Sequence, residues 1–227
     1  EARGRKRLVT STIEHEAVLN TCRHLARRGY DWATVPATTD GVVTTAALEA
    51  VLTPETAIVS VMHANNEIGT IQPIAEIAQL AHARGALLHT DAVQSVGKIP
   101  VDVRALGADL LSLSAHKFNG PKGAGALWIK RGTRLLPIVT GGKHERNRRA
   151  GTENVPAIVG LGVAIGFDEI AEDRGDHDTT HADEYRCHEE DDDHHRERER
   201  VPVGRREICD AEHLDDADHE PADHRAG

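Results

Sequence analysis

Strand-like apolar runs alternate with amphipathic segments along the first 170 residues, and this alternation constrains the fold more than any other feature. The run TAIVSVMH at 56–63 is almost continuously apolar, which is typical of a strand buried on both faces. The segment PIAEIAQLAHARG at 73–85 begins with Pro and ends with Gly, as many helices do. Repeated strand and helix predict an α/β fold, with a mainly parallel sheet and helices on both of its faces.

The same patterns recur elsewhere in this region. Further strands are expected at 7–11, 30–36, 86–91, 108–114 and 125–130, and further helices at 14–29, 44–52 and 154–170. Ligands of parallel sheets bind beyond the carboxyl ends of the strands. The polar residues that follow each expected strand are therefore the first candidates for a functional site.

The apolar periodicity stops near residue 170. Residues 171–227 hold 21 Asp and Glu, eight Arg and no Lys, so this tail accounts for the acidic net charge of −10. A segment with so little apolar surface cannot offset its ordering entropy. We expect a partial folded domain at 1–170 and a disordered, acidic and His-rich tail at 171–227. The abrupt change of pattern suggests that the tail is an out-of-frame product of a frameshift.

Composition excludes several classes of protein. The three Cys are scattered without close pairing, which favours a reducing cytoplasm over a disulfide scaffold. No apolar run reaches the length of a membrane span, so we expect no membrane contact. Aromatic residues are few and the folded part is only weakly basic, so direct nucleic-acid binding is not expected.

Polar residues gather after three of the expected strands. They are His63, Asn65, Asn66, Asp91, Gln94, Ser114, His116 and Lys117. Each alone has an ordinary explanation, such as a turn, a helix cap or a solvated lysine. Together they suit pyridoxal phosphate, which needs a lysine for its aldehyde, an acid for its ring nitrogen and donors for its phosphate. We expect Lys117 at the buried end of a strand, where desolvation favours the neutral amine.

Five stretches in this order resemble the class V aminotransferase family, and within it the cysteine desulfurases. They are TSTIEHEAVL, MHANNEIGTIQPI, HTDAVQSVGKIPVDV, SLSAHKFNGPKGAGALW and RRAGTENVPAIVG. The resemblance runs from about residue 7 to residue 168. It implies part of the large domain of a transferase that depends on pyridoxal 5'-phosphate.

The resemblance implies catalytic roles for two residues. Lys117 corresponds to the lysine that binds the cofactor as a Schiff base. His15 corresponds to the histidine that stacks on the cofactor ring and relays protons. Beside these two, Asp91 corresponds to the carboxylate that pairs with the ring nitrogen.

The remaining cofactor contacts are also implied by the resemblance. Gln94 and Asn66 correspond to groups near the phenolic oxygen and the substrate. Ser114 and His116 correspond to phosphate ligands. Thr152 corresponds to a threonine that reaches the phosphate in the partner subunit, so a homodimer is implied. No metal site is predicted.

The implied activity is removal of sulfur from L-cysteine, which leaves L-alanine and a persulfide on the enzyme. The sulfur would pass to an acceptor protein, either an iron–sulfur scaffold or a relay for tRNA thiolation. The family's phosphate-binding Gly-Ala-Thr-Glu turn, nucleophilic cysteine loop and substrate-binding arginine find no match in this sequence. We therefore expect an incomplete, N-terminally truncated and inactive fragment.

Two alternatives stay open at this point. The first is another class V enzyme, either a selenocysteine lyase or a small-molecule aminotransferase. The second is a metal-binding or interaction protein that acts through its tail, where His194 and His195 stand among carboxylates. The glycines of GPKGAG do not match a nucleotide phosphate loop, and we expect them to serve the turn between two strands.

Overall fold

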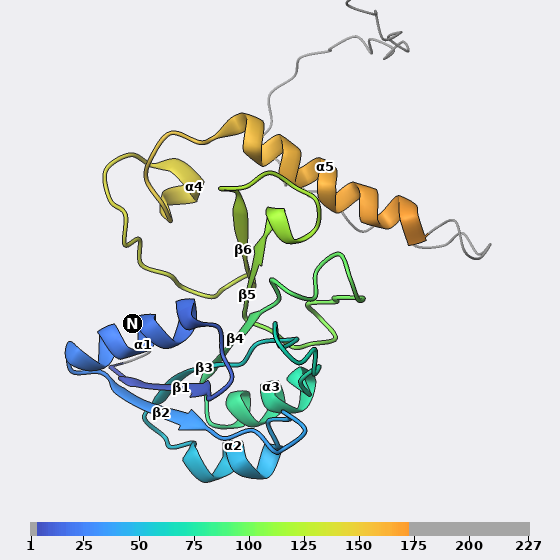
Figure 1. The fold of residues 1–227 in the computed structure, drawn as a ribbon. Helices are drawn as coiled ribbons and strands as arrows, with labels where there is room; N and C mark the ends of the chain where they lie inside the picture. Colours follow the sequence, from blue (N-terminus) through green and yellow to red (C-terminus); the bar gives the residue numbers. More distant parts are fainter. Residues whose placement is uncertain (1–3, 173–227) are drawn as a thin grey trace, which may run out of the picture. The chain divides into compact units, whose positions relative to one another are not determined.

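The computed structural model describes residues 4–172, and side chains up to residue 166. Within this range the chain forms one six-stranded sheet, in the order β2-β1-β3-β4-β5-β6 (Figure 1). The strands are β1 (Arg7–Ser11), β2 (Asp31–Val35), β3 (Thr56–Ser60), β4 (Leu87–Asp91), β5 (Leu110–Ser114) and β6 (Gly125–Ile129). The first five are parallel, and β6 runs antiparallel to β5. The predicted mainly parallel sheet is therefore confirmed.

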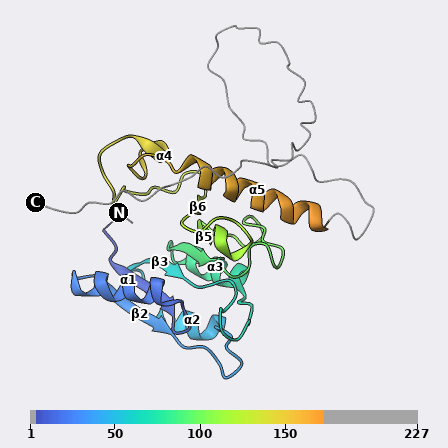
Figure 2. The ribbon, with the colours of Figure 1, turned by 45° about the horizontal axis from the view of Figure 1, so that its top comes forward.

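The helices cover both faces of this sheet. The α-helices are α1 (Glu16–Arg27), α2 (Thr45–Val51), α3 (Ile74–Ala83), α4 (His144–Asn147) and α5 (Val155–Glu172), and η1 (Ala115–Lys117) is a 3-10 turn. Helices α1 and α2 both contact β2, and they lie on opposite sides of it (Figures 1 and 2). The prediction of helices on both faces is confirmed.

The main core lies between the sheet and helices α2 and α3. Val9, Val59 and Leu88 come from three adjacent strands, and Leu48 and Ile77 from the two helices, and none of them is exposed. Each such side chain contributes about 1.5–3 kcal/mol on burial. This layer fixes the strands, and with them the positions of the loops at their carboxyl ends.

A second, smaller cluster joins α5 to the turn after β5. Phe118 and Ala115 pack there against Leu161 and Ala164 of α5. Figure 2 shows α5 lying across the ends of β5 and β6. This packing supports the turn that carries Lys117 from one side.

Glycine is required where the chain leaves this turn. A Cβ on Gly120 would lie 2.8 Å from the Cβ of Ala115 and 2.9 Å from its carbonyl oxygen. The amide of Gly120 donates to that same oxygen at 2.8 Å. The glycines of this segment thus serve the turn from β5 into β6, as the sequence indicates.

The sequence also led to expectations about the C-terminal tail and about membrane spans. The predicted tail at 171–227 lies almost wholly outside the described residues. Among the helices that the structure describes, none is long and apolar enough to cross a membrane.

Candidate active site

A cavity of about 310 Å³ opens beyond the carboxyl ends of the parallel strands. Its lining comes from the segment after β1 with the start of α1, from the loop after β3, and from the ends of β4 and β5 with the segments that follow them, including η1. The lining residues are His15, Ala17, Met62, Ala64, Asn66, Asp91, Val93, Gln94, Ser114, His116 and Lys117. Of the eight residues to which the family resemblance gives a role, all but Thr152 line this cavity. Its volume suits a small ligand.

Lys117 lies in the 3-10 turn η1, and it is exposed. The expectation of a lysine at a buried strand end is wrong, because β5 ends at Ser114 and the chain turns at once. Amides of Phe118 and Gly120 both donate to the carbonyl of Ala115, which closes this turn. Among the described residues, the Lys117 amine has no hydrogen-bond or ion-pair partner and is free to receive a ligand.

Asp91 is the last residue of β4, and it is half-buried. Its Oδ1 accepts a hydrogen bond from the amide of Val93 at 2.9 Å, so it does cap the following turn. One carboxylate oxygen is occupied in this way. The other, Oδ2, has no hydrogen bond to the described part of the chain and can accept one from a ligand.

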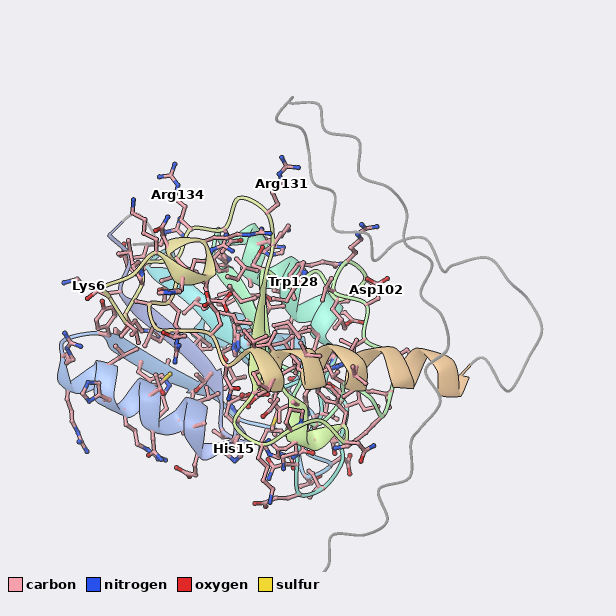
Figure 3. All side chains as sticks on the ribbon, turned by 90° about the horizontal axis from the view of Figure 1, so that it is seen from above. Lys6, His15, Asp102, Trp128, Arg131 and Arg134 are labelled. Carbon is pink, nitrogen blue, oxygen red and sulfur yellow. The ribbon has the colours of Figure 1, made fainter. Side chains whose placement is uncertain are left out.

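His15 stands at the N-terminal end of α1 (Figure 3). Its Nδ1 accepts a hydrogen bond from the amide of Ala17 at 3.1 Å, which caps the helix. A neutral ring whose Nδ1 accepts carries its proton on Nε2. The ring is exposed and lines the cavity with its orientation set by the cap.

Ser114 and His116 form a pair at the end of β5. The Ser114 hydroxyl lies 3.0 Å from His116 Nδ1. A hydroxyl and an imidazole held together are suitable donors for an anionic group. Their place beside Lys117 in the cavity lining agrees with the predicted phosphate contacts, and their role stays a prediction.

The amide residues differ in what they do. Gln94 lines the cavity, and its Oε1 accepts a hydrogen bond from Lys98 Nζ at 2.9 Å. Asn66 also lines the cavity, whereas Asn65 stabilises the loop by accepting hydrogen bonds from two backbone amides. Thr152 is exposed and is not part of this cavity's lining.

Two histidines outside the cavity lining received no role from the sequence: His63, which is buried, and His89, which is half-buried. His63 Nδ1 lies 2.9 Å from the Ser95 hydroxyl. His89 lies between Ser60, 2.7 Å from Nδ1, and Ser112, 3.0 Å from Nε2. Burial lowers the pKa of both imidazoles. The sequence did contain a signal for His89, because it lies two residues before Asp91 on the same strand.

Glu14 is a further residue that the sequence did not single out. It is only 5% exposed, although it directly precedes His15. Burial raises the pKa of its carboxyl group to about 7, against the opposing effect of hydrogen bonds from Ser11 and Met62. A buried carboxyl group beside a cavity is a common mark of a functional site.

Comparisons with known proteins identify the family of the chain. The family model described as Aminotransferase class-V matches residues 2–190. A cysteine desulfurase of Cereibacter sphaeroides is 53% identical over 173 residues, which is 74% of this chain and 45% of that protein. The chain belongs to the class-V aminotransferase family, whose members are pyridoxal phosphate enzymes.

Solved structures give the same result. A NifS-like protein superposes with a TM-score of 0.72 at 40% identity, covering 76% of this chain and 48% of that one. A structure titled SspA in complex with cysteine superposes with a TM-score of 0.69 at 38% identity, covering 76% of this chain and 54% of that one. The chain thus spans about half the length of the relatives it matches.

Proposed function

We propose that this chain provides the cofactor-binding half of a pyridoxal phosphate-dependent cysteine desulfurase. The observation that carries the proposal is the cavity that gathers Lys117, Asp91, Ser114 and His116 beyond the carboxyl edge of the sheet. About half of the aligned residues are identical to those of a curated cysteine desulfurase. The chemistry of these side chains fits the cofactor's three polar ends.

The fit follows from the donor set. Lys117 has a free amine for the aldehyde, and the unoccupied Oδ2 of Asp91 can accept from a protonated ring nitrogen. The Ser114 hydroxyl and the His116 imidazole, 3.0 Å apart, can donate to the phosphate. When bound, pyridoxal phosphate supplies an electron sink that stabilises a carbanion on the substrate.

The chain's own residues would then handle binding and protons. Asp91 keeps the ring nitrogen protonated by its negative charge. His15 has its Nδ1 held by the Ala17 amide, so Nε2 is the atom that can hold or move a proton at the cavity. Gln94 and Asn66 line the cavity and would contact the substrate or the phenolic oxygen of the cofactor.

In the proposed reaction the carbon–sulfur bond of L-cysteine breaks, L-alanine leaves, and a cysteine thiol of the enzyme keeps the sulfur as a persulfide. Among the described residues the one cysteine is Cys22, which is 8% exposed and does not line the cavity. We therefore expect residues 4–172 to bind cofactor without releasing alanine. A sulfur-acceptor protein in the cytoplasm, serving iron–sulfur clusters or tRNA thiolation, is part of the proposal.

A homodimer is also part of the proposal. Apolar side chains are exposed in α5 and in the segment before it. Ile138 of that segment is 96% exposed, and Val155, the first residue of α5, is 60% exposed. Val159 and Val163 of α5 are at least half exposed as well. Monomeric proteins rarely leave such a set uncovered. Its nearness in sequence to Thr152 supports an interface at which that threonine meets a second copy.

Titration with pyridoxal phosphate, followed by absorbance, tests the proposed function. We expect saturable binding to the protein and weaker binding to the Asp91→Asn variant, which keeps the bond to Val93 but loses the charge. Unsaturable binding, or equal affinity in both proteins, would contradict the site. L-cysteine should change the absorption of the bound cofactor, and a response to L-alanine alone would favour an aminotransferase instead.

A further inference from the structure

The carboxyl group of Glu14 connects two segments that are far apart in the sequence. Its Oε1 accepts a hydrogen bond from the Ser11 hydroxyl at 2.6 Å and another from the Met62 amide at 2.8 Å. Ser11 ends β1, and Met62 lies just beyond the end of β3. One side chain therefore joins the loop after β1 to the loop after β3.

Both joined segments form walls of the cavity. His15, the residue after Glu14, lines it from the first segment, and Met62 lines it from the second. Asn65 adds a parallel link, because its Nδ2 donates to the carbonyl oxygen of Ile13 at 3.0 Å. The Glu14 carboxyl is nevertheless the group that binds the Met62 backbone directly.

The second oxygen of Glu14 gives this link an unusual character. Within the described part of the chain, Oε2 is fully buried and has no hydrogen-bond partner. An ionised oxygen in such a place is costly, whereas a protonated carboxyl group leaves only a neutral hydroxyl there. Burial is the largest cause of the raised pKa, and the charge of Asp91 on β4 adds to it.

Titratable groups lie near Glu14 on neighbouring elements. Asp91 faces Glu14 from β4, and Cys22 interacts with it from α1. His15 and His63 are the chain neighbours of Glu14 and Met62, the two bonded residues. Both hydrogen bonds to Oε1 can exist whether the carboxyl group is neutral or ionised, but only the neutral form avoids a buried charge near Asp91.

We propose that Glu14 is a positioning residue of this site: its carboxyl group couples the loop that carries His15 to the end of β3, and so sets where His15 lies at the cavity. The inference deepens the proposed function and rests on it, since it gives His15 its place toward the cofactor. It makes the placement of His15 depend on a hydrogen-bond acceptor at position 14 and not on a charge there.

A single NMR signal reports on this coupling directly. The sequence contains one methionine, so labelling with 15N-methionine gives one amide signal from the body of the protein, that of Met62. In cofactor-free protein this signal should shift with a midpoint near pH 7 as Glu14 ionises. The Glu14→Gln variant keeps an acceptor but cannot ionise, so that step should vanish while any shift caused by His63 persists. Identical titrations of the two proteins would overturn the inference.

The positioning role itself needs a second comparison. The ring signals of His15 should move in Glu14→Ala, which loses the acceptor, and return to the wild-type positions in Glu14→Gln. Unchanged His15 signals in Glu14→Ala would overturn the role. If Glu14→Ala does not fold, Glu14→Asp replaces it, because the shorter side chain cannot reach Met62. These measurements use protein without cofactor, so failure of cofactor binding leaves their outcome readable.

Discussion

The His89 ring and the Ser112 hydroxyl are 3.0 Å apart, from Nε2 to Oγ, across strands β4 and β5. The other ring nitrogen reaches Ser60 on β3. One side chain therefore links three parallel strands close to their carboxyl ends, two residues before Asp91. Because each serine hydroxyl can donate or accept, a neutral ring keeps both bonds by donating through one nitrogen and accepting through the other.

Acid should weaken the protein through this histidine. Burial lowers the pKa of His89 below its usual 6.5, and the charge of Asp91 offsets this only in part. The unfolded chain then binds more protons below pH 6.5 than the folded one, so the free energy of unfolding falls as the pH falls through that range. Urea unfolding at several pH values should show a shallower fall for His89→Gln than for wild type. Equal slopes would show that His89 does not titrate as described.

The free energy of unfolding should fall as the pH rises from 4.5 to about 7, because Glu14 ionises in this range. Its carboxyl pKa rises from 4.5 to about 7, so stability present below pH 4.5 is lost as the pH rises to about 7. The difference corresponds to a free energy on the order of 3 kcal/mol. Glu14→Gln should remove this loss and unfold at a higher urea concentration than wild type near neutral pH. Greater stability of the wild type at that pH would contradict the buried, raised pKa.

The Ser114–His116 pair should discriminate between pyridoxal phosphate and pyridoxal, which lacks the phosphate. Loss of one hydrogen bond to a charged group costs about 1.5–3 kcal/mol, or roughly a tenfold or greater loss of affinity. Ser114→Ala should therefore weaken binding of the phosphate form and leave pyridoxal binding nearly unchanged. Ser112→Ala is the matched control: it loses a hydroxyl from the same strand outside the cavity lining, and any effect through its bond to His89 should be equal for both ligands. An equal effect of Ser114→Ala on both ligands would count against phosphate binding there.

Gly120 should tolerate no side chain. Alanine there would place its Cβ 2.8 Å from the Cβ of Ala115, and the turn that carries Lys117 would have to move. We expect a loss of about 1–3 kcal/mol in unfolding free energy, together with weaker cofactor binding. Gly162 is an exposed glycine in α5 where an added Cβ would meet no atom within 4 Å, so Gly162→Ala should stabilise by about 0.5–1 kcal/mol. Thermal unfolding of both variants checks the contrast, and a neutral Gly120→Ala would contradict the packing.

Periodicity alone predicted most of the strands and helices. The strand at 7–11 coincides with β1, and the helices at 44–52 and 73–85 contain α2 and α3. These elements are dictated by local apolar spacing, by the Thr44 cap and by the Gly85 stop. The antiparallel direction of β6 could also have been predicted, because the connection 115–124 is too short for the crossover helix that a parallel pair needs.

The site was predictable only in part. Asp91 and Ser114 end parallel strands and Lys117 lies just beyond one, so topology alone gathers them at one edge. The exposure of Lys117 was missed, because a 3-10 turn of three residues leaves no periodic signal. The role of Glu14 was missed for another reason: its bond to Met62 spans 48 residues of sequence, and no local pattern encodes such a contact.

Lys117 is the residue that we propose as the anchor of the cofactor. The protein should be incubated with pyridoxal phosphate and reduced with borohydride, and its peptides analysed by mass spectrometry. We predict one dominant adduct on Lys117, absent from Lys117→Ala and retained in Lys122→Ala, whose lysine lies in the same exposed segment outside the cavity lining. Equal labelling of Lys117 and Lys122, or an undiminished total in Lys117→Ala, would show that Lys117 is not the anchor.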